Sequence, residues 1–192
     1  MRALLIVSLA ACSDTTTHAL FDGRSLAGWQ GDPALWRVDD GAIVGVTDGT
    51  LDHNTFLVHA EPVANFVLRA EFQLRSGNSG LQFRSVALPD HVVHGYQADI
   101  ATDTMGILYD EGGRGTLADT DQAAVLSHVD LAGWNRYEVS ADGPHITLSI
   151  NGYTTVEYVE TEDAPDTGVI ALQLHVGPPM EVRFRELVVD VR

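Results

Sequence analysis

Polar and apolar residues alternate along four stretches of the chain, which is the pattern of strands buried on one side. In residues 68–74 the even positions are apolar and the odd positions polar, and residues 81–84, 96–100 and 170–175 repeat the alternation. Successive strand residues face opposite sides of a sheet, so each stretch offers one face to a core and one polar face. We predict that six of the polar residues share one sheet face: Glu71, Arg84, Gln97, Asp99, Gln173 and His175.

Turn sequences separate strand patterns along most of the chain. Asp-Gly or Asn-Gly pairs stand at positions 40–41, 142–143 and 151–152, and such pairs favour tight hairpins. The one helical pattern, residues 120–129, is one or two turns long. We count about eleven strands, without a repeat or an internal linker. The pattern predicts an all-β sandwich or jelly roll of two antiparallel sheets, with one concave polar face.

The charge of the chain limits its partners. The 192 residues include 27 acidic and 11 basic residues, and every basic residue is Arg. Without Lys, the chain has no Schiff-base chemistry and no lysine to bind phosphate. A net charge of −16 argues against nucleic-acid binding, which needs a basic surface.

The start of the chain resembles a bacterial lipoprotein signal. Met1-Arg2 precedes an apolar run, and Leu9-Ala10-Ala11-Cys12 matches the motif that places small residues before a Cys to be lipidated. The alternative is a buried segment with a chance Cys. We predict a signal peptide at 1–11, lipidation of Cys12, a tether at 12–19 and one domain at 20–192. The protein would then be anchored by lipid in the bacterial cell envelope, with no other membrane contact.

The polar set also indicates a chemistry. Glu, Gln, Arg, Asp and His are planar hydrogen-bonding groups, which suit the hydroxyls of a sugar. The alternative is a solvated outer face, as antiparallel sheets commonly have. Residues 106–115 contain four glycines and form either a loop that approaches a ligand closely or a mobile surface loop.

Eight fragments, in order, resemble the 3-keto-disaccharide hydrolase domain family. They run from Leu20 to the C-terminus, and each is weak alone. The fragments are 20–29, 36–43, 77–84, 95–99, 108–115, 134–137, 150–152 and 172–175. The resemblance implies a concanavalin A-like jelly roll and a sugar substrate oxidised at C3. A partner oxidoreductase could supply that sugar. The chain departs from the family pattern at Leu148-Ser149 and at Val176-Gly177.

The expected reaction is removal of the acidic C2 proton, β-elimination of the C1 aglycone and hydration of the product. We assign His175 as the base, Arg84 as the group that stabilises the enolate, and Glu111 as the proton donor. A buried structural histidine and an Arg84–Glu71 ion pair are the alternative roles. The predicted substrate ligands are Glu71, Asn78, Gln97, Asp99, Tyr109, Arg114 and Gln173.

Two questions stay open at this point. No cofactor is required by the sequence, but Glu71, Asp99, Glu111 and His175 could converge on a divalent metal ion. A non-catalytic carbohydrate-binding module would present the same polar face without chemistry. A retaining glucanase is disfavoured, because the Glu-x-Asp-x-x-Glu motif of such jelly-roll enzymes is missing from the sequence.

Overall fold

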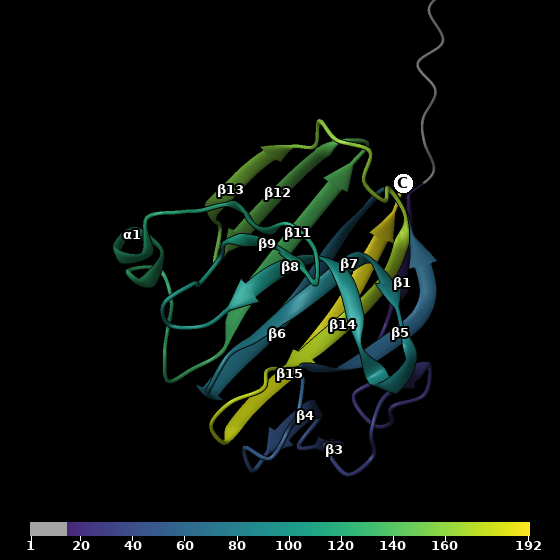
Figure 1. Cartoon of the computed structure of the whole chain (residues 1–192), viewed down its shortest axis with the longest axis vertical. Coiled ribbons are helices and arrows are strands. Elements are labelled where there is room, and N and C mark those ends of the chain that lie inside the picture. Colours follow the sequence, from purple (N-terminus) through teal and green to yellow (C-terminus); the bar gives the residue numbers. More distant parts are fainter. Residues whose placement is uncertain (1–14) are drawn as a thin grey trace, which may run out of the picture.

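Two antiparallel sheets packed face to face make up the fold (Figure 1). The computed structural model describes residues 15–192, and within them there are fifteen strands, one short α-helix and one 3₁₀ turn. The all-β jelly-roll prediction is confirmed. The strands beyond the eleven expected include short ones at the sheet edges, whose length is too small to show an alternating pattern.

The first sheet has eight strands. Seven follow the order β13-β12-β11-β6-β15-β4-β3, and β1 pairs with the last part of β15. The strands are β1 (Thr16–Ala19), β3 (Trp36–Asp39), β4 (Ala42–Thr47), β6 (Phe66–Ser76), β11 (Asn135–Asp142), β12 (His145–Ile150), β13 (Tyr153–Val159) and β15 (Met180–Val191).

The second sheet has seven strands in the order β10-β9-β8-β7-β14-β5-β2. They are β2 (Trp29–Gln30), β5 (Thr55–Val63), β7 (Ser79–Ala87), β8 (Val93–Ile100), β9 (Leu108–Glu111), β10 (Gly115–Ala118) and β14 (Gly168–Leu174). Helix α1 (Gln122–Leu126) stands apart at one side of the sandwich (Figure 1). The 3₁₀ turn η1 (Pro89–His91) lies in the connection from β7 to β8.

The apolar halves of the alternating stretches fill the space between the sheets. Leu68 and Phe72 from the first sheet and Phe83 and Leu172 from the second are all essentially inaccessible. Phe83 stacks on Tyr96, with ring centroids 5.5 Å apart. Because the alternation is kept, the polar residues between these positions lie on the outer faces of both sheets.

The N-terminal predictions meet the structure only in part. Cys12 and residues 1–11 lie outside the described residues. The tether was predicted to run to residue 19, and this is wrong for residues 16–19, which form β1 and pair with β15. None of the helices in the described part is long and apolar enough to cross a bilayer.

Candidate functional site

A chain of side-chain hydrogen bonds crosses the outer face of the seven-stranded sheet. The hydroxyl of Ser85 donates to Oε1 of Gln82 (2.8 Å), and Nε2 of Gln82 donates to Oε1 of Gln97 (2.8 Å). Nε2 of Gln97 then donates to Oδ1 of Asp99 (2.5 Å). All four residues are buried. Each amide uses its oxygen on one neighbour and its nitrogen on the next, so the chain fixes the carboxyl group of Asp99 in one orientation.

Asp99 is a buried carboxyl group whose pKa lies about one unit below neutral pH. Asp99 is only 5% exposed, and this burial raises its pKa from the ordinary value of 3.8 to about 6. The hydrogen bond from Gln97 lowers this pKa but does not offset the burial. The negative charge of Glu111 acts in the same direction as burial, and His175 acts against it. A carboxyl with such a pKa can give and take a proton in the physiological range.

Glu111, at the end of β9, is held by two amides. Nδ2 of Asn54 donates to Oε1 of Glu111 (2.9 Å), and Nε2 of Gln173 donates to Oε2 (3.2 Å). The Oδ1 of Asn54 accepts from the backbone N–H of Val176 (2.9 Å). Asn54 therefore ties Glu111 to the backbone that follows β14. The sequence analysis missed Asn54, because a single polar residue in a loop shows no periodicity; only the pairing of β5 with β14 brings it here.

His175 follows directly after β14, and a hydrogen bond to its own neighbour sets its tautomer. Its Nδ1 lies 2.5 Å from the carbonyl oxygen of Val176. Since a carbonyl oxygen only accepts, Nδ1 carries the proton and Nε2 of the neutral ring is left with its lone pair. This is the form of imidazole that can accept a proton.

These groups line one cavity of about 250 Å³. Its walls come from β8, β9, β10 and the ends of β7 and β14. The lining residues are Asn54, Asn78, Gln97, Asp99, Thr104, Ile107, Tyr109, Glu111, Thr116 and His175. Two buried acceptors, Oδ1 of Asn78 and Oε1 of the neighbouring Gln173, have no hydrogen-bond partner among the described residues. Buried acceptors without partners are costly, and hydroxyl groups of a ligand would satisfy them.

The other half of this sheet face is apolar and covered. Phe56, Val58, Val93 and Ala171 form a small buried cluster outside the main core. The 3₁₀ turn η1 packs against β5, so the β7–β8 connection closes over that part of the sheet. The polar cavity lies on the part of the sheet face that this connection does not cover. Because the covered part is apolar, only the remaining part of the face carries the predicted polar pattern.

Seven of the ten predicted site residues meet at this place. The cavity is lined by Asn78, Gln97, Asp99, Tyr109, Glu111 and His175, and Gln173 contacts it through Glu111. Arg114 does not take part: it binds Asp110 (2.7 Å) and Glu160 (2.8 Å) and lies over the ring of Tyr96. The assignment of Arg114 to this site was wrong, because its side chain is held by these acidic partners away from the cavity.

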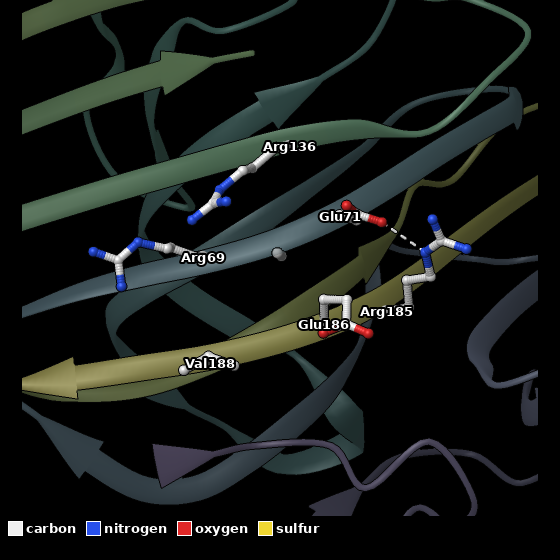
Figure 2. Close-up of a pocket in the computed structure, with 7 residues that line it drawn as sticks. Arg69, Glu71, Arg136, Arg185, Glu186 and Val188 are labelled. Atoms are coloured by element: carbon white, nitrogen blue, oxygen red, sulfur yellow. Dashed lines mark hydrogen bonds and ion pairs between the residues drawn. The ribbon is translucent and has the colours of Figure 1, made fainter. Parts of the chain in front are cut away.

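The placement of Glu71 on this face was also wrong. Glu71 belongs to β6, which is in the other sheet, and its carboxylate pairs with Arg185 on β15 (2.6 Å; Figure 2). The alternation of residues 68–74 gave the correct inward and outward positions. It carries no information on which of the two sheets a strand joins. The four-ligand metal site that included Glu71 therefore does not form.

Arg84 is a structural residue rather than part of the cavity. A bulge between Phe83 and Val86 interrupts the pairing of β7 with β8, and Arg84 has a φ of 47°. Its guanidinium donates to the carbonyls of Ala64 (2.8 Å) and Gly143 (2.7 Å) and to Oδ1 of Asn65 (3.1 Å). Ala64 and Asn65 lie in the connection from β5 to β6, which links the two sheets, and Gly143 lies in the β11–β12 turn of the opposite sheet, so Arg84 joins the two layers. Burial lowers the pKa of Arg84 from its usual value.

Fold and site together define a jelly-roll protein with a polar cavity on one sheet, and the family match gives this class a carbohydrate-related function. The chain belongs to the family of 3-keto-alpha-glucoside-1,2-lyase-like domains, which matches residues 16–190. The suspected resemblance is thereby confirmed. None of the curated proteins matches the chain.

Solved structures share the fold at low sequence identity. Two chains described as candidate glycosyl hydrolases from Parabacteroides distasonis are 21% and 20% identical, with TM-scores of 0.70 and 0.69. Each match covers 92% of this chain, and 100% and 94% of the other. The carbohydrate binding module CBM66 from Bacillus subtilis is 14% identical with a TM-score of 0.67, over 85% of this chain and 95% of the module. The fold thus occurs in both enzyme-like and binding proteins.

Within residues 15–192, no group of three or more His, Cys, Asp and Glu side chains is placed to hold a metal ion. Asp99, Glu111 and His175 line the same cavity, but their interactions are with amides and backbone groups. Their contacts are those of acid–base and hydrogen-bonding groups.

Proposed function

We propose that the cavity cleaves glycosides whose sugar is oxidised at C3. The observation that carries the proposal is the presence of a base and an acid in one cavity: His175 with a free Nε2 lone pair, and Asp99 with a pKa of about 6. Membership of the lyase-like family supports the choice of substrate. A ketone at C3 makes the proton on C2 acidic, because the carbanion formed is an enolate.

The reaction would run in two stages. His175 removes the C2 proton, and the electron pair enters the enolate of the C3 ketone. The enolate then reforms the ketone, a double bond forms between C1 and C2, and the C1–O bond to the aglycone breaks. Water subsequently adds to the double bond, which gives net hydrolysis. Both stages use general acid–base catalysis, which contributes about 10²–10⁴-fold to a rate.

The structure supports a change in the proton donor. The sequence assigns this role to Glu111, but Glu111 accepts hydrogen bonds from both Asn54 and Gln173. Both oxygens of Glu111 are thus occupied as acceptors, whereas Asp99 accepts from an amide through Oδ1 alone. Asp99, by contrast, carries a proton over part of the neutral range. Asp99 is therefore the better donor for the leaving oxygen, and Glu111 the better ligand for sugar hydroxyls.

No arginine lines the cavity in the described part of the chain. The enolate oxygen would instead meet neutral donors, for which the lining residues Tyr109 and Asn78 offer a hydroxyl and an amide. The unpartnered oxygens of Asn78 and Gln173 would accept from sugar hydroxyls.

The test is release of an aglycone from two matched substrates. A chromogenic 3-keto-glucoside should be cleaved, whereas the unoxidised glucoside should not, because its C2 proton is not acidic. His175→Ala should slow the reaction by about 10²–10⁴-fold. His145→Ala, an exposed histidine on β12, is the matched control and should leave the rate unchanged. Equal cleavage of both substrates would overturn the elimination mechanism.

A non-catalytic carbohydrate-binding function is the second candidate, favoured by the likeness to CBM66. It predicts binding of the glycoside without release of the aglycone, and equal binding by wild type and His175→Ala. The same two substrates, followed by calorimetry, separate the two functions.

Supply of the substrate and location in the cell belong to the same proposal. A 3-keto sugar must come from an oxidoreductase that acts on C3, and we propose such an enzyme as the partner.

We also propose that Cys12 carries lipid and holds the protein in the cell envelope. Cys12→Ala should move the protein from the membrane fraction to the soluble fraction, and unchanged fractionation would contradict the anchor.

A further inference from the structure

A second cavity lies on the outer face of the other sheet, where nothing in the proposed reaction takes place. It has a volume of about 470 Å³, against about 250 Å³ for the cavity described above. Its lining comes from the three adjacent strands β11, β6 and β15 (Figure 2). The lining residues are Arg69, Ala70, Glu71, Arg136, Arg185, Glu186 and Val188. We call this the arginine pocket.

A bulge in β15 creates the hollow. Arg185 pairs with Glu71 and Val188 with Arg69, so two residues of β15 stand opposite the single residue Ala70. Glu186, inside the bulge, has a φ of 51°, which is uncommon for a residue other than glycine. A bulge bends the strand and redirects side chains, and strained residues of this kind often mark functional positions. The result is a depression on a sheet face that would otherwise be even.

The three arginines of the pocket differ in their partners. Arg69 binds Glu138 and Asp190, and Arg185 binds Glu71 (2.6 Å). The guanidinium of Arg136 has no ion pair and no hydrogen bond with any of residues 15–192. Figure 2 shows it directed from β11 toward the same hollow as Arg69. Arg24 and Arg37 also have no ion pair with a described residue, but they do not line this pocket, whereas Arg136 does.

Carboxylates and an aromatic ring complete the surroundings. Glu186 is exposed, and the structure gives it no ion pair with another described residue. The guanidinium of Arg185 lies 4.1 Å from the centre of the Trp134 ring, which holds both side chains beside the pocket. The pocket thus combines a free fork of N–H donors, carboxylate acceptors and an adjacent aromatic side chain.

We propose that the arginine pocket binds a uronic acid residue of an acidic glycan. The carboxylate of the uronate would take two parallel hydrogen bonds from Arg136, the geometry that guanidinium groups favour. Glu186 and Glu71 would accept hydrogen bonds from the ring hydroxyls. A ligand that carries only an anionic group would be repelled by these carboxylates. A uronate carries a carboxylate for the arginine and hydroxyl groups that can donate to the two glutamates. The volume is within the range of small-ligand sites.

The pocket would hold a glycan without acting on it. It lies on the outer face of the eight-stranded sheet. The cavity that contains Asp99, Glu111 and His175, called the reaction cavity from here on, lies on the outer face of the seven-stranded sheet. Two sheets packed about 10 Å apart separate the two sites. Binding here would keep the protein on an acidic polysaccharide while the other face remains free.

The test is calorimetric titration of the full chain with three probes of equal length: an oligogalacturonate, its neutral galactose counterpart and a sulfated galactose oligomer. The oligogalacturonate should bind, and Arg136→Gln should weaken it by about tenfold to a hundredfold, the scale of a charge-assisted hydrogen bond. Arg37→Gln is the matched control, because Arg37 is an exposed arginine of the same sheet, on β3, four strands away. It should leave binding unchanged.

The other outcomes contradict the proposal. Equal loss in Arg37→Gln and Arg136→Gln would show general charge attraction, and tighter binding of the sulfated probe would show an oxyanion site of another kind. Binding of the neutral probe, or no binding of any probe, would exclude a uronate as the ligand of the pocket. Cleavage of the 3-keto-glucoside by Arg136→Gln should equal that of wild type, so failure of this proposal and failure of the proposed reaction are distinguished.

Discussion

Asn54 donates a hydrogen bond of 2.9 Å to Glu111, a residue 57 positions further along the chain. The pair joins the loop before β5 to the end of β9, two strands that are separated in the sheet by β14, β7 and β8. Asn54 also accepts a hydrogen bond at Oδ1 from the backbone N–H of Val176, which brings the backbone beside His175 into the same network. One amide thus positions two of the groups that line the reaction cavity.

Replacement of Asn54 should therefore impair the reaction without unfolding the protein. Asn54→Ala leaves Glu111 with one partner and releases the backbone at Val176, so we expect kcat/KM for the 3-keto-glucoside to fall by about tenfold to a hundredfold. Asp52→Ala, an exposed carboxylate in the same loop, is the control and should have no effect. If both variants react at the wild-type rate, Asn54 is not part of the site.

Asp99 should make the stability of the protein depend on pH. Its folded pKa of about 6 lies above the ordinary 3.8, so between these values the folded state binds more protons than the unfolded state. Stability should therefore be greatest below pH 3.8 as far as Asp99 is concerned, and fall as the pH rises toward 6. The full loss is about 3 kcal/mol, at 1.36 kcal/mol for each unit of pKa.

Asp99→Asn tests this sign directly, because asparagine can still accept the bond from Gln97 but does not titrate. We expect the variant to be more stable than wild type by up to about 3 kcal/mol at pH 7. The difference should vanish near pH 4. Urea unfolding at a series of pH values measures it, and the same variant should lose cleavage activity. A stability difference that does not change with pH would contradict the raised pKa.

The alternating pattern was sufficient to predict the fold class and the inward side of each strand. Leu81, Phe83, Leu172 and Leu174 are in the core, and the polar residues between them are on the outside, as expected. Glu71 shows what the pattern lacks. Side-chain alternation repeats every two residues in any sheet, so it cannot distinguish the two sheets of a sandwich, and the outward residues of β6 were assigned to the wrong one.

Arg84 shows a second limit. The period of two assumes an uninterrupted ladder, and the bulge between Phe83 and Val86 breaks it at the position in question. Nothing in the local sequence marks the bulge, because its residue with positive φ is Arg84 itself and not glycine. Asn54 was missed and Arg114 was misplaced for a related reason. The contacts of Asn54 with Glu111 and Val176, and of Arg114 with Glu160, join residues that are distant in sequence and that only the strand order brings together.

The role of Arg84 can be tested by separating stability from activity. Arg84→Met keeps the length of the side chain but leaves the carbonyls of Ala64 and Gly143 without their donor. We expect the free energy of unfolding to fall by about 3 kcal/mol. The melting temperature should drop by about 6–12 °C. The kcat of the folded variant should stay within a fewfold of wild type. Arg24→Met, at an exposed position, should change neither quantity. Lost activity at unchanged stability would instead show that Arg84 takes part in the reaction.

Gly80 should be required for the orientation of Gln97. A Cβ at position 80 would lie 2.5 Å from Cγ and Cδ of Gln97, which is too close for any real contact. Gln97 is held at its amide by Gln82 and Asp99, so it cannot yield without breaking a hydrogen bond. Gly80→Ala should lower stability by about 1–3 kcal/mol, the usual cost of overpacking, and should also reduce cleavage.

The double variant Gly80→Ala/Gln97→Ala separates this clash from a general effect of alanine in β7. Because shortening Gln97 removes the atoms that the new methyl group meets, the two changes should not be additive. We expect the double variant to be more stable than the sum of the single variants predicts, by about 1 kcal/mol or more, in chemical unfolding. Its activity should remain low, since the bond from Gln97 to Asp99 is lost. Strict additivity of the two stability changes would show that Gly80 acts through the backbone and not through Gln97.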